Sequence, residues 1–277
     1  MTNYGPATEA KIAEVVTACG RYGKSAIIAL AGVPGTGKSF VAAAAAQRFA
    51  TDLLFVREVQ FHQSFSYEEF IEGMRLDTTG GFRVQPGVFL DWNKQAVDDK
   101  DHRYVLLIEE LTRANLAAVL GEVLTFIEYR ERPFLTIYGR QPVKIAKNLT
   151  ILATYNPTDR SAIDLDAALM RRLRIITCPP DTTQLREMLK DLPSKVLDRL
   201  CQVFTACETE HPDEYEHLMP FGHGIFAGVT KESPDLYDLW HERIVHMLQR
   251  PLVPHHAFLD TIKANYPWLN SPQTTLP

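Results

Sequence analysis

Apolar runs and amphipathic segments alternate along the first two thirds of the chain. Buried strands are predicted where short apolar runs occur, at residues 26–31, 53–61, 104–108, 149–154 and 174–178. Helices are predicted where alanines cluster or apolar residues recur every three or four positions, at residues 7–19, 39–49, 114–129 and 164–173. Strands that alternate with helices indicate an α/β fold, in which helices cover both faces of a parallel sheet.

The order of elements changes after the two prolines at residues 179–180. Before them, residues 134–145 predict a hairpin. Beyond them no run has strand character, and residues 181–265 have the apolar spacing of helices. We therefore predict an α/β domain at residues 1–180 and a smaller helical domain at residues 181–277, which ends in a loose tail.

Composition and charge narrow the class of protein. The 277 residues include 45% hydrophobic and 23% charged side chains, with a formal net charge of −5. This composition predicts a globular core and excludes a mainly disordered chain. The acidic balance argues against a broad nucleic-acid-binding surface. The apolar runs are too short to span a membrane, and the first residues do not resemble a signal peptide, so we expect a cytoplasmic protein with no membrane contact.

Residues 32–39 match the pattern G-x-x-x-x-G-K-[ST] and lie between a predicted strand and a predicted helix. Glycines let the backbone curl so that its N–H groups point at phosphate oxygens, and the helix N-terminus adds a positive dipole. Lys38 is expected to reach the β- and γ-phosphates, and Ser39 to bind Mg²⁺. The alternative is a glycine-rich turn before an ordinary helix. The candidate nucleotide-binding residues are Gly32, Pro34, Gly35, Thr36, Gly37, Lys38, Ser39 and Phe40.

Two acidic residues follow the predicted strand at residues 104–108. Ligand sites of parallel sheets lie at the carboxyl ends of the strands, so Glu109 and Glu110 are expected beside the phosphate loop. Glu109 is the candidate ligand of Mg²⁺, partly through water, and Glu110 is the candidate general base that activates the attacking water. The alternative is a solvated strand end without a chemical role.

Further candidates act at the γ-phosphate. Asn156 follows the predicted strand at residues 149–154, and its amide can both donate and accept a hydrogen bond, although Asn-Pro is also a common start of a turn. The predicted helix at residues 164–173 carries Arg171 and Arg172 near its C-terminal end, and Arg174 lies just beyond it. They either stabilise the helix dipole or act on the γ-phosphate of a neighbouring subunit as an arginine finger.

These motifs, taken in their order along the chain, resemble those of the AAA+ ATPases. The finer similarity is to the dynein-related and MoxR-like branch, and within it to the McrB-type NTPase domains of modification-dependent restriction systems. The stretches that resemble this family are residues 59–64, 67–73, 110–116, 121–122, 154–161 and 165–173. The resemblance extends over about residues 25–250.

The resemblance implies a P-loop NTPase fold with a helical lid, and a ring of identical subunits, usually a hexamer, that hydrolyses ATP or GTP with Mg²⁺ between subunits. It makes Lys38 and Ser39 the Walker A pair, Glu109 and Glu110 the Walker B pair, and Asn156 sensor 1. The residues that it assigns to the subunit interface are Arg171 or Arg172 as the finger, with Asp159 and Arg160 near the nucleotide. Thr112 and Pro157 depart from the family pattern, and residues 221–226 resemble a lid motif of unassigned chemistry.

For function, the resemblance implies a ring-forming motor that drives a McrC-like partner nuclease in DNA restriction or defence against phage. Only about 25 residues precede the motor, so we expect DNA contact to be indirect, through the partner. Two alternatives remain: a MoxR-like remodelling chaperone for a metalloenzyme or VWA-type client, and a nucleotide-gated scaffold with little catalysis. A small-molecule kinase is disfavoured by the acidic pair and the arginines. The sequence leaves the choice between ATP and GTP open.

Overall fold

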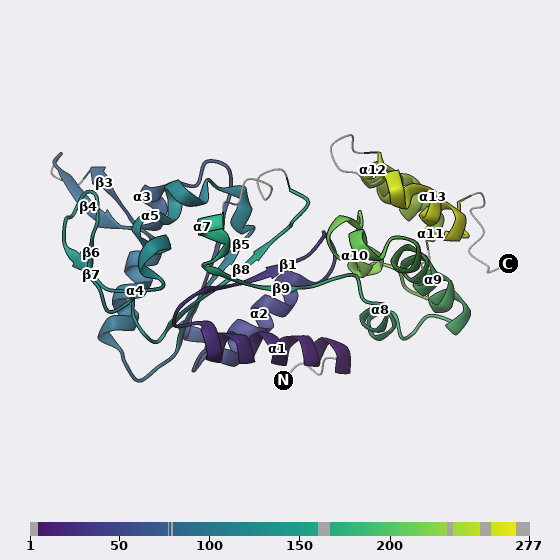
Figure 1. Cartoon of the computed structure of the whole chain (residues 1–277), viewed down its shortest axis with the longest axis horizontal. Coiled ribbons are helices and arrows are strands. Elements are labelled where there is room, and N and C mark those ends of the chain that lie inside the picture. The colour runs from purple at the N-terminus through teal and green to yellow at the C-terminus, as the bar shows by residue number, and fades with distance from the viewer. Residues whose placement is uncertain are drawn as a thin grey trace. The chain divides into compact units, whose positions relative to one another are not determined.

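The computed structural model describes residues 5–76, 78, 80–159, 167–231, 235–249 and 256–269. Contacts within the chain divide it into two compact units, each described separately below (Figure 1). The sheet unit comprises Lys11–Ala31 and Ser39–Ile176, and the helical unit comprises Met1–Ala10, Gly32–Lys38 and Thr177–Pro277. The phosphate loop therefore groups with the C-terminal helices, and a domain boundary at residue 180 stays a prediction.

A five-stranded sheet forms the centre of the sheet unit, in the order β2-β5-β8-β1-β9 (Figure 1). Its strands are β1 (Ile27–Ala31), β2 (Val56–Gln60), β5 (Tyr104–Glu109), β8 (Leu149–Tyr155) and β9 (Leu173–Thr177). The pairs β1–β8, β5–β8 and β2–β5 are parallel. Every residue of β1 and β8 is buried, as expected for strands covered on both faces. The mostly parallel sheet confirms the predicted α/β fold class.

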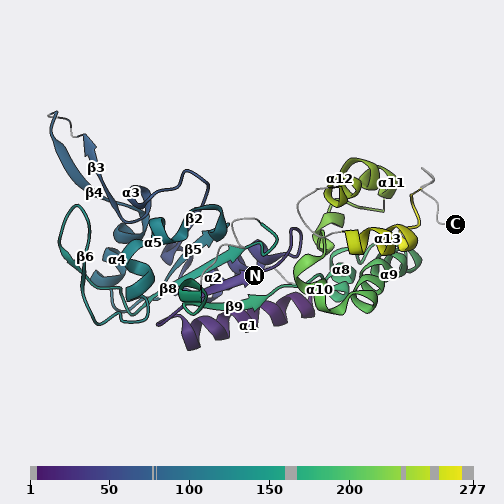
Figure 2. The same cartoon turned by 45° about the horizontal axis from the view of Figure 1, so that its top comes forward.

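Helices cover the two faces of this sheet. The helices α1 (Pro6–Tyr22) and α2 (Lys38–Phe49) lie below the sheet in Figure 1, and α3 (Tyr67–Phe70) and α5 (Leu116–Phe126) lie on the other side; Figure 2 shows the same elements turned by 45°. The helix α4 (Val88–Asp98) contributes Phe89 and Trp92 to the core beside α3 and α5.

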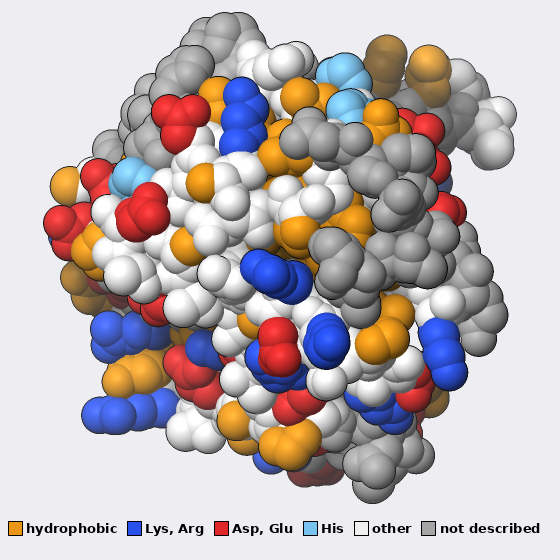
Figure 3. All heavy atoms as spheres, turned by 90° about the vertical axis from the view of Figure 1, so that its right-hand side faces the viewer, with side chains coloured by type: hydrophobic (Ala, Val, Ile, Leu, Met, Phe, Trp, Pro, Cys, Tyr) orange, Lys and Arg blue, Asp and Glu red, His pale blue; other side chains and the backbone are white. Residues whose placement is uncertain are grey.

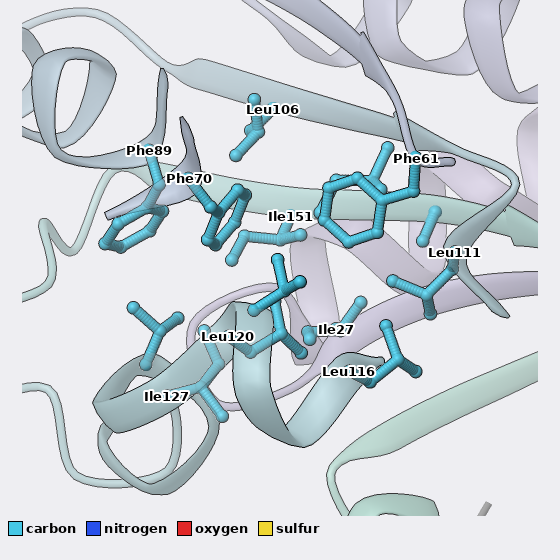
Figure 4. Close-up of a cluster of buried hydrophobic side chains, with 14 of the residues drawn as sticks. Ile27, Phe61, Phe70, Phe89, Leu106, Leu111, Leu116, Leu120, Ile127 and Ile151 are labelled. Atoms are coloured by element: carbon cyan, nitrogen blue, oxygen red, sulfur yellow. The ribbon is translucent and has the colours of Figure 1, made fainter. Parts of the chain in front are cut away.

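The core between the sheet and α3–α5 is rich in large apolar side chains. Phe61, Phe70 and Phe89 meet Ile151 of β8, and Leu120 of α5 packs against the same cluster (Figure 4). Each of these side chains has less than 2% of its surface exposed. Burial of one such side chain contributes about 1.5–3 kcal/mol, so this core holds the strand ends of the site in place.

One predicted strand begins later than expected. The apolar run at residues 53–61 predicts a strand throughout, but residues Leu53–Phe55 form a 3₁₀ helix, η1. The carboxylate of Asp52 caps this helix by accepting a hydrogen bond from the backbone N–H of Leu54 at 3.1 Å. Leu53 and Leu54 are 63% and 81% exposed, so their apolar character does not reflect burial in a strand.

Two hairpins project from the sheet unit. The first, β3 (Glu72–Leu76) with β4 (Phe82–Pro86), lies in a region for which we predicted no strand. The second, β6 (Phe134–Leu135) with β7 (Pro142–Val143), confirms the hairpin predicted at residues 134–145. The buried carboxylate of Glu72 accepts hydrogen bonds from the backbone N–H groups of Tyr138 and Gly139 at 2.9 and 2.7 Å, which fixes the loop of the second hairpin against the base of the first.

The helical unit contains no strand beyond β9 among its described residues, as predicted. Its elements are α8 (Thr182–Met188), α9 (Ser194–Glu210), α10 (Pro212–Leu218), the 3₁₀ helix η3 (His223–Phe226), α11 (Leu236–Leu239), the π-helix η4 (Trp240–Ile244), α12 (Val245–Leu248) and α13 (His256–Asn265). Phe204, Phe221 and Phe226 form the centre of its separate core.

One face of the protein carries charged side chains of both signs. On the face turned to the viewer in Figure 3, basic and acidic side chains are interspersed among uncharged ones. The described side chains on this face therefore form no extended patch of one sign. Within the described part of the chain, no helix has both the length and the apolar character needed to cross a membrane.

Candidate functional site

The phosphate loop connects β1 to α2. It starts at Gly32, directly after the strand, and ends where α2 begins at Lys38. Gly35 and Gly37 have φ values of 83° and 77°, in the left-handed region that side chains with a Cβ rarely adopt. The Thr36 hydroxyl and the Lys38 ammonium donate hydrogen bonds to the carbonyl of Val33 at 3.1 and 3.5 Å. The loop therefore has the backbone curl that phosphate binding requires.

The first residues of α2 in the sheet unit are Ser39 and Phe40. The Ser39 hydroxyl donates a hydrogen bond of 2.8 Å to Oε2 of Glu109, at the end of β5. The Thr154 hydroxyl, near the end of β8, donates to the same carboxylate oxygen. Hydroxyl and carboxylate oxygens are the ligands that Mg²⁺ prefers, so this group fits the ion. Phe40 is 51% exposed.

Sequence reasoning missed Thr154 as a member of this group. A signal was present, because Thr154 and Asn156 are two residues apart at the end of a strand, and such residues lie on the same face.

Glu110 has an unusual backbone conformation and a charged neighbour. Its φ of 56° and ψ of 46° are left-handed, which costs a residue with a Cβ about 1–2 kcal/mol. Arg113 Nε lies 3.2 Å from Glu110 Oε2 and 3.5 Å from Oδ2 of Asp159. The Arg113 side chain is 53% exposed, so these ion pairs are weak and the Glu110 carboxylate is readily released. We predicted no role for Arg113 from the sequence, although it lies three residues after Glu110.

Asn156 is buried at the end of β8, and its amide stabilises the turn that follows. Its Oδ1 accepts hydrogen bonds from the backbone N–H and the hydroxyl of Thr158, at 3.0 and 2.8 Å. Its Nδ2 donates to Oδ1 of Asp159 at 3.1 Å. The alternative interpretation as a turn residue is therefore correct for this state of the protein, and a role as sensor 1 stays a prediction. Arg160 lies outside the described residues.

The two adjacent arginines proposed as the finger, Arg171 and Arg172, differ in burial. The helix predicted at residues 164–173 ends earlier than expected, because α7 (Ala167–Met170) stops before both arginines; residues 164–166 lie outside the described residues. The side chain of Arg172 is 8% exposed, with Nε 3.2 Å from Glu128 Oε2 and Nη1 bonded to the carbonyl of Ala168. The side chain of Arg171 is 58% exposed, and its Nη2 lies 3.2 Å from Glu128 Oε2.

The third arginine, Arg174, stacks on the ring of Tyr22 with its Cζ 4.1 Å from the ring centre. Of Arg171 and Arg172, Arg171 therefore has the more accessible guanidinium, and Arg172 is buried in contacts that stabilise the fold.

The loop at residues 221–226 packs against the phosphate loop, and both belong to the helical unit. The backbone N–H of Gly222 donates to the carbonyl of Pro34 at 2.7 Å, and that of Gly224 donates to the carbonyl of Gly35 at 2.6 Å. A Cβ added at Gly222 or Gly224 would lie 2.5 or 2.7 Å from backbone atoms of Gly35. Both positions therefore require glycine, which gives a physical reason for the motif that the sequence left unassigned.

We expect Gly222→Ala to lower the free energy of unfolding by about 1–3 kcal/mol, because its Cβ forces the 221–226 loop away from Gly35. Gly228→Ala is the matched control, since a Cβ there meets no atom within 4 Å. Chemical denaturation of both variants measures the difference. Equal stability of the two variants would contradict the close approach of the two loops.

Comparison with known proteins identifies the family of this chain. Residues 27–173, more than half of the chain, match the model of the AAA domain of the dynein-related subfamily. The chain is 33% identical over 259 residues to the type IV methyl-directed restriction enzyme EcoKMcrB subunit of Escherichia coli (strain K12), across 88% of this chain and 56% of that protein. It is 25% identical over 183 residues to the type II restriction enzyme BsuMI component YdiS of Bacillus subtilis (strain 168), across 51% of this chain and 53% of that protein.

The chain thus spans about half the length of the curated relatives that it matches. Its similarity to the McrB subunit confirms the resemblance that the motifs indicated. The match of the family model over the strands, the phosphate loop and the acidic strand end shows that the chain belongs to the dynein-related subfamily of AAA domains.

Proposed function

We propose that this AAA domain is a nucleoside triphosphatase that binds ATP or GTP together with Mg²⁺ and hydrolyses it. The contact between two side chains supports this proposal. The Ser39 hydroxyl of the phosphate-loop motif and the Glu109 carboxylate, 70 residues apart in sequence, lie 2.8 Å apart. A hydroxyl and a carboxylate that meet directly after a phosphate loop are the two protein ligands that a nucleotide-bound Mg²⁺ needs.

Each proposed residue has a distinct task. The N–H groups of residues 32–38 and the Lys38 ammonium bind the phosphates, and Ser39 and Glu109 hold the metal ion. Mg²⁺ bound there would neutralise negative charge on the phosphates. The Glu110 carboxylate accepts the proton of the attacking water, which requires release from Arg113.

Asn156 orients the attacking water or the γ-phosphate once its amide leaves the turn with Thr158. Asp159 and Arg160 are proposed to act near the nucleotide at the subunit interface. The exposed position of Arg171 supports a role as the finger that one subunit of a ring, a hexamer in our proposal, supplies to the next.

Both relatives are named as components of restriction enzymes, which supports a restriction system as the setting of this chain. We propose that the ring is a motor for a McrC-like nuclease subunit and that it contacts DNA through that partner. Residues 181–277 would act as the helical lid of each subunit. This setting is preferred over a remodelling chaperone because both relatives, one named as part of a type IV and the other as part of a type II restriction enzyme, share it.

Replacement of Lys38 tests the proposed function. We expect Lys38→Ala to weaken the binding of ATP or GTP by about 100-fold or more, because the ammonium forms charge-assisted hydrogen bonds to phosphate. Lys24→Ala, which removes an exposed lysine elsewhere, should bind like the wild type. Isothermal titration calorimetry with Mg²⁺ and each nucleotide measures both. Equal affinity of Lys38→Ala and wild type would exclude this site.

A further inference from the structure

A buried histidine of the helical unit faces the phosphate loop. His223 lies between the two glycines that pack against Gly35, and it is 4% exposed. The backbone N–H of Asp181 donates to its Nδ1 at 3.1 Å. Nδ1 is therefore the acceptor nitrogen, and in the neutral ring the proton resides on Nε2. A Cβ added at Gly37 would lie 3.8 Å from this Nε2 atom.

The environment keeps this ring neutral. Burial lowers the pKa of His223 from its ordinary value, and the nearby Asp181 carboxylate opposes that shift less strongly. Among the described residues, the N–H of Asp181 is the one group that forms a hydrogen bond with the ring. Nε2–H is therefore an uncharged donor at the phosphate loop.

Asp181 orients a second side chain in the same direction. Its carboxylate caps α8 by accepting hydrogen bonds from the N–H groups of Thr183 and Gln184, at 2.7 and 3.2 Å. It also accepts one from Nε2 of Gln184 at 3.3 Å. The Oε1 atom of Gln184 then lies 3.9 Å from the position of a Cβ at Gly37. Asp181 thus holds both His223 and Gln184 against the loop, which fixes their positions before a ligand arrives.

We propose that His223 is a nucleotide-binding residue whose Nε2–H donates a hydrogen bond to a phosphate oxygen of the triphosphate in the phosphate loop. This inference rests on the proposed function. The phosphate, and not the base, is the expected acceptor because Gly37 precedes Lys38, the residue that reaches the phosphates. A charged acceptor also makes the strongest hydrogen bond with a fixed donor. The 221–226 loop, a part of the helical unit, would thereby contact a bound triphosphate directly.

A pair of substitutions separates this role from a purely structural one. In His223→Asn, the amide oxygen can replace Nδ1 and accept the N–H of Asp181, but no atom reaches the position of Nε2. In His223→Gln, the amide nitrogen can replace the Nε2 donor, while the Nδ1 acceptor is lost. A structural role therefore predicts that Asn is tolerated and Gln is not, and a ligand role predicts the reverse.

We expect His223→Asn to weaken binding of Mg²⁺ with ATP or GTP by about 10- to 100-fold, and His223→Gln to stay within about threefold of wild type. Calorimetry with each nucleotide and with inorganic tripolyphosphate provides the measurement. Tripolyphosphate has no base, so an equal loss of its affinity in His223→Asn supports the phosphate contact. Loss of nucleotide affinity alone would assign His223 to the base and overturn the proposal.

The wild-type protein gives a second measurement that needs no variant. The ¹⁵N resonance of His223 Nε2 should shift when tripolyphosphate is added, more than that of Nδ1; an unchanged Nε2 resonance at saturation would overturn the proposal. The outcomes also separate the two proposals. If Lys38→Ala binds like wild type, the proposed function fails. If Lys38→Ala loses binding and His223→Asn does not, only the role of His223 fails.

Discussion

Arg171→Ala is expected to lower the rate of nucleotide hydrolysis by about 10³-fold or more and to leave nucleotide affinity close to that of the wild type. The guanidinium of Arg171 is 58% exposed and, among the described residues, pairs with Glu128 alone, so an exposed charge is available to the site of an adjacent subunit. Its positive charge would stabilise the charge that develops on the transferred phosphoryl group in the transition state. Steady-state turnover and calorimetry on the assembled protein measure the two effects separately.

The neighbouring arginines are the controls for this prediction. Arg172→Ala should lower the free energy of unfolding by about 1–3 kcal/mol, because the Ala168 carbonyl loses its guanidinium donor and Glu128 keeps the exposed Arg171 as its remaining described partner. Arg174→Ala removes only a stacking contact with Tyr22 and should keep turnover near wild type. If Arg171→Ala hydrolyses nucleotide at the wild-type rate, Arg171 is not the finger.

Glu110→Gln is expected to lower hydrolysis by about 10²- to 10⁴-fold while nucleotide still binds, because an amide cannot accept the proton of the attacking water. Glu109→Gln is the matched control on the adjacent residue. It should weaken metal binding, so its rate should recover as the Mg²⁺ concentration rises, whereas the rate of Glu110→Gln should not. Wild-type turnover by Glu110→Gln would remove Glu110 as the base.

Mixing the two inactive variants tests whether the finger acts between subunits. An Arg171→Ala subunit keeps an intact Glu110, and a Glu110→Gln subunit keeps an intact Arg171. An interface between them has one complete site, so the mixture should regain part of the activity that each variant lacks alone. A mixture that stays inactive, despite assembly of both variants into one ring, would place the finger and the base in the same subunit.

Strands could be predicted where an apolar run is buried, but not where a local cap competes with the strand. The buried strands at residues 104–108 and 149–154 were predictable because continuous apolar runs of that length are characteristic of the interior of a parallel sheet. Residues 53–55 are equally apolar, yet the cap at Asp52 makes them a 3₁₀ helix with exposed leucines. Local hydrogen bonds therefore overrode the apolar pattern there.

The arginines and the acidic strand end show that the sequence alone does not determine which side chains meet in the site. Arg171 and Arg172 are chemically identical and adjacent, so the sequence left both as fingers, and only their different burial separates them. Thr154 shares the Glu109 carboxylate with Ser39 because β5 and β8 are neighbours in the sheet, and strand order is not encoded in any local pattern. The assignments of Glu110, Asn156 and Asp159 to catalysis or nucleotide binding stay predictions.

The amino-acid sequence by itself determined the phosphate loop, the alternation of strands and helices and the family, because these depend on local residue types and their spacing. Only the tertiary structure decided that Gly222 and Gly224 lie against Gly35 and that His223 faces Gly37. These pairs are close in space but about 190 residues apart in the chain, so their contact depends on how the helical unit packs around the loop.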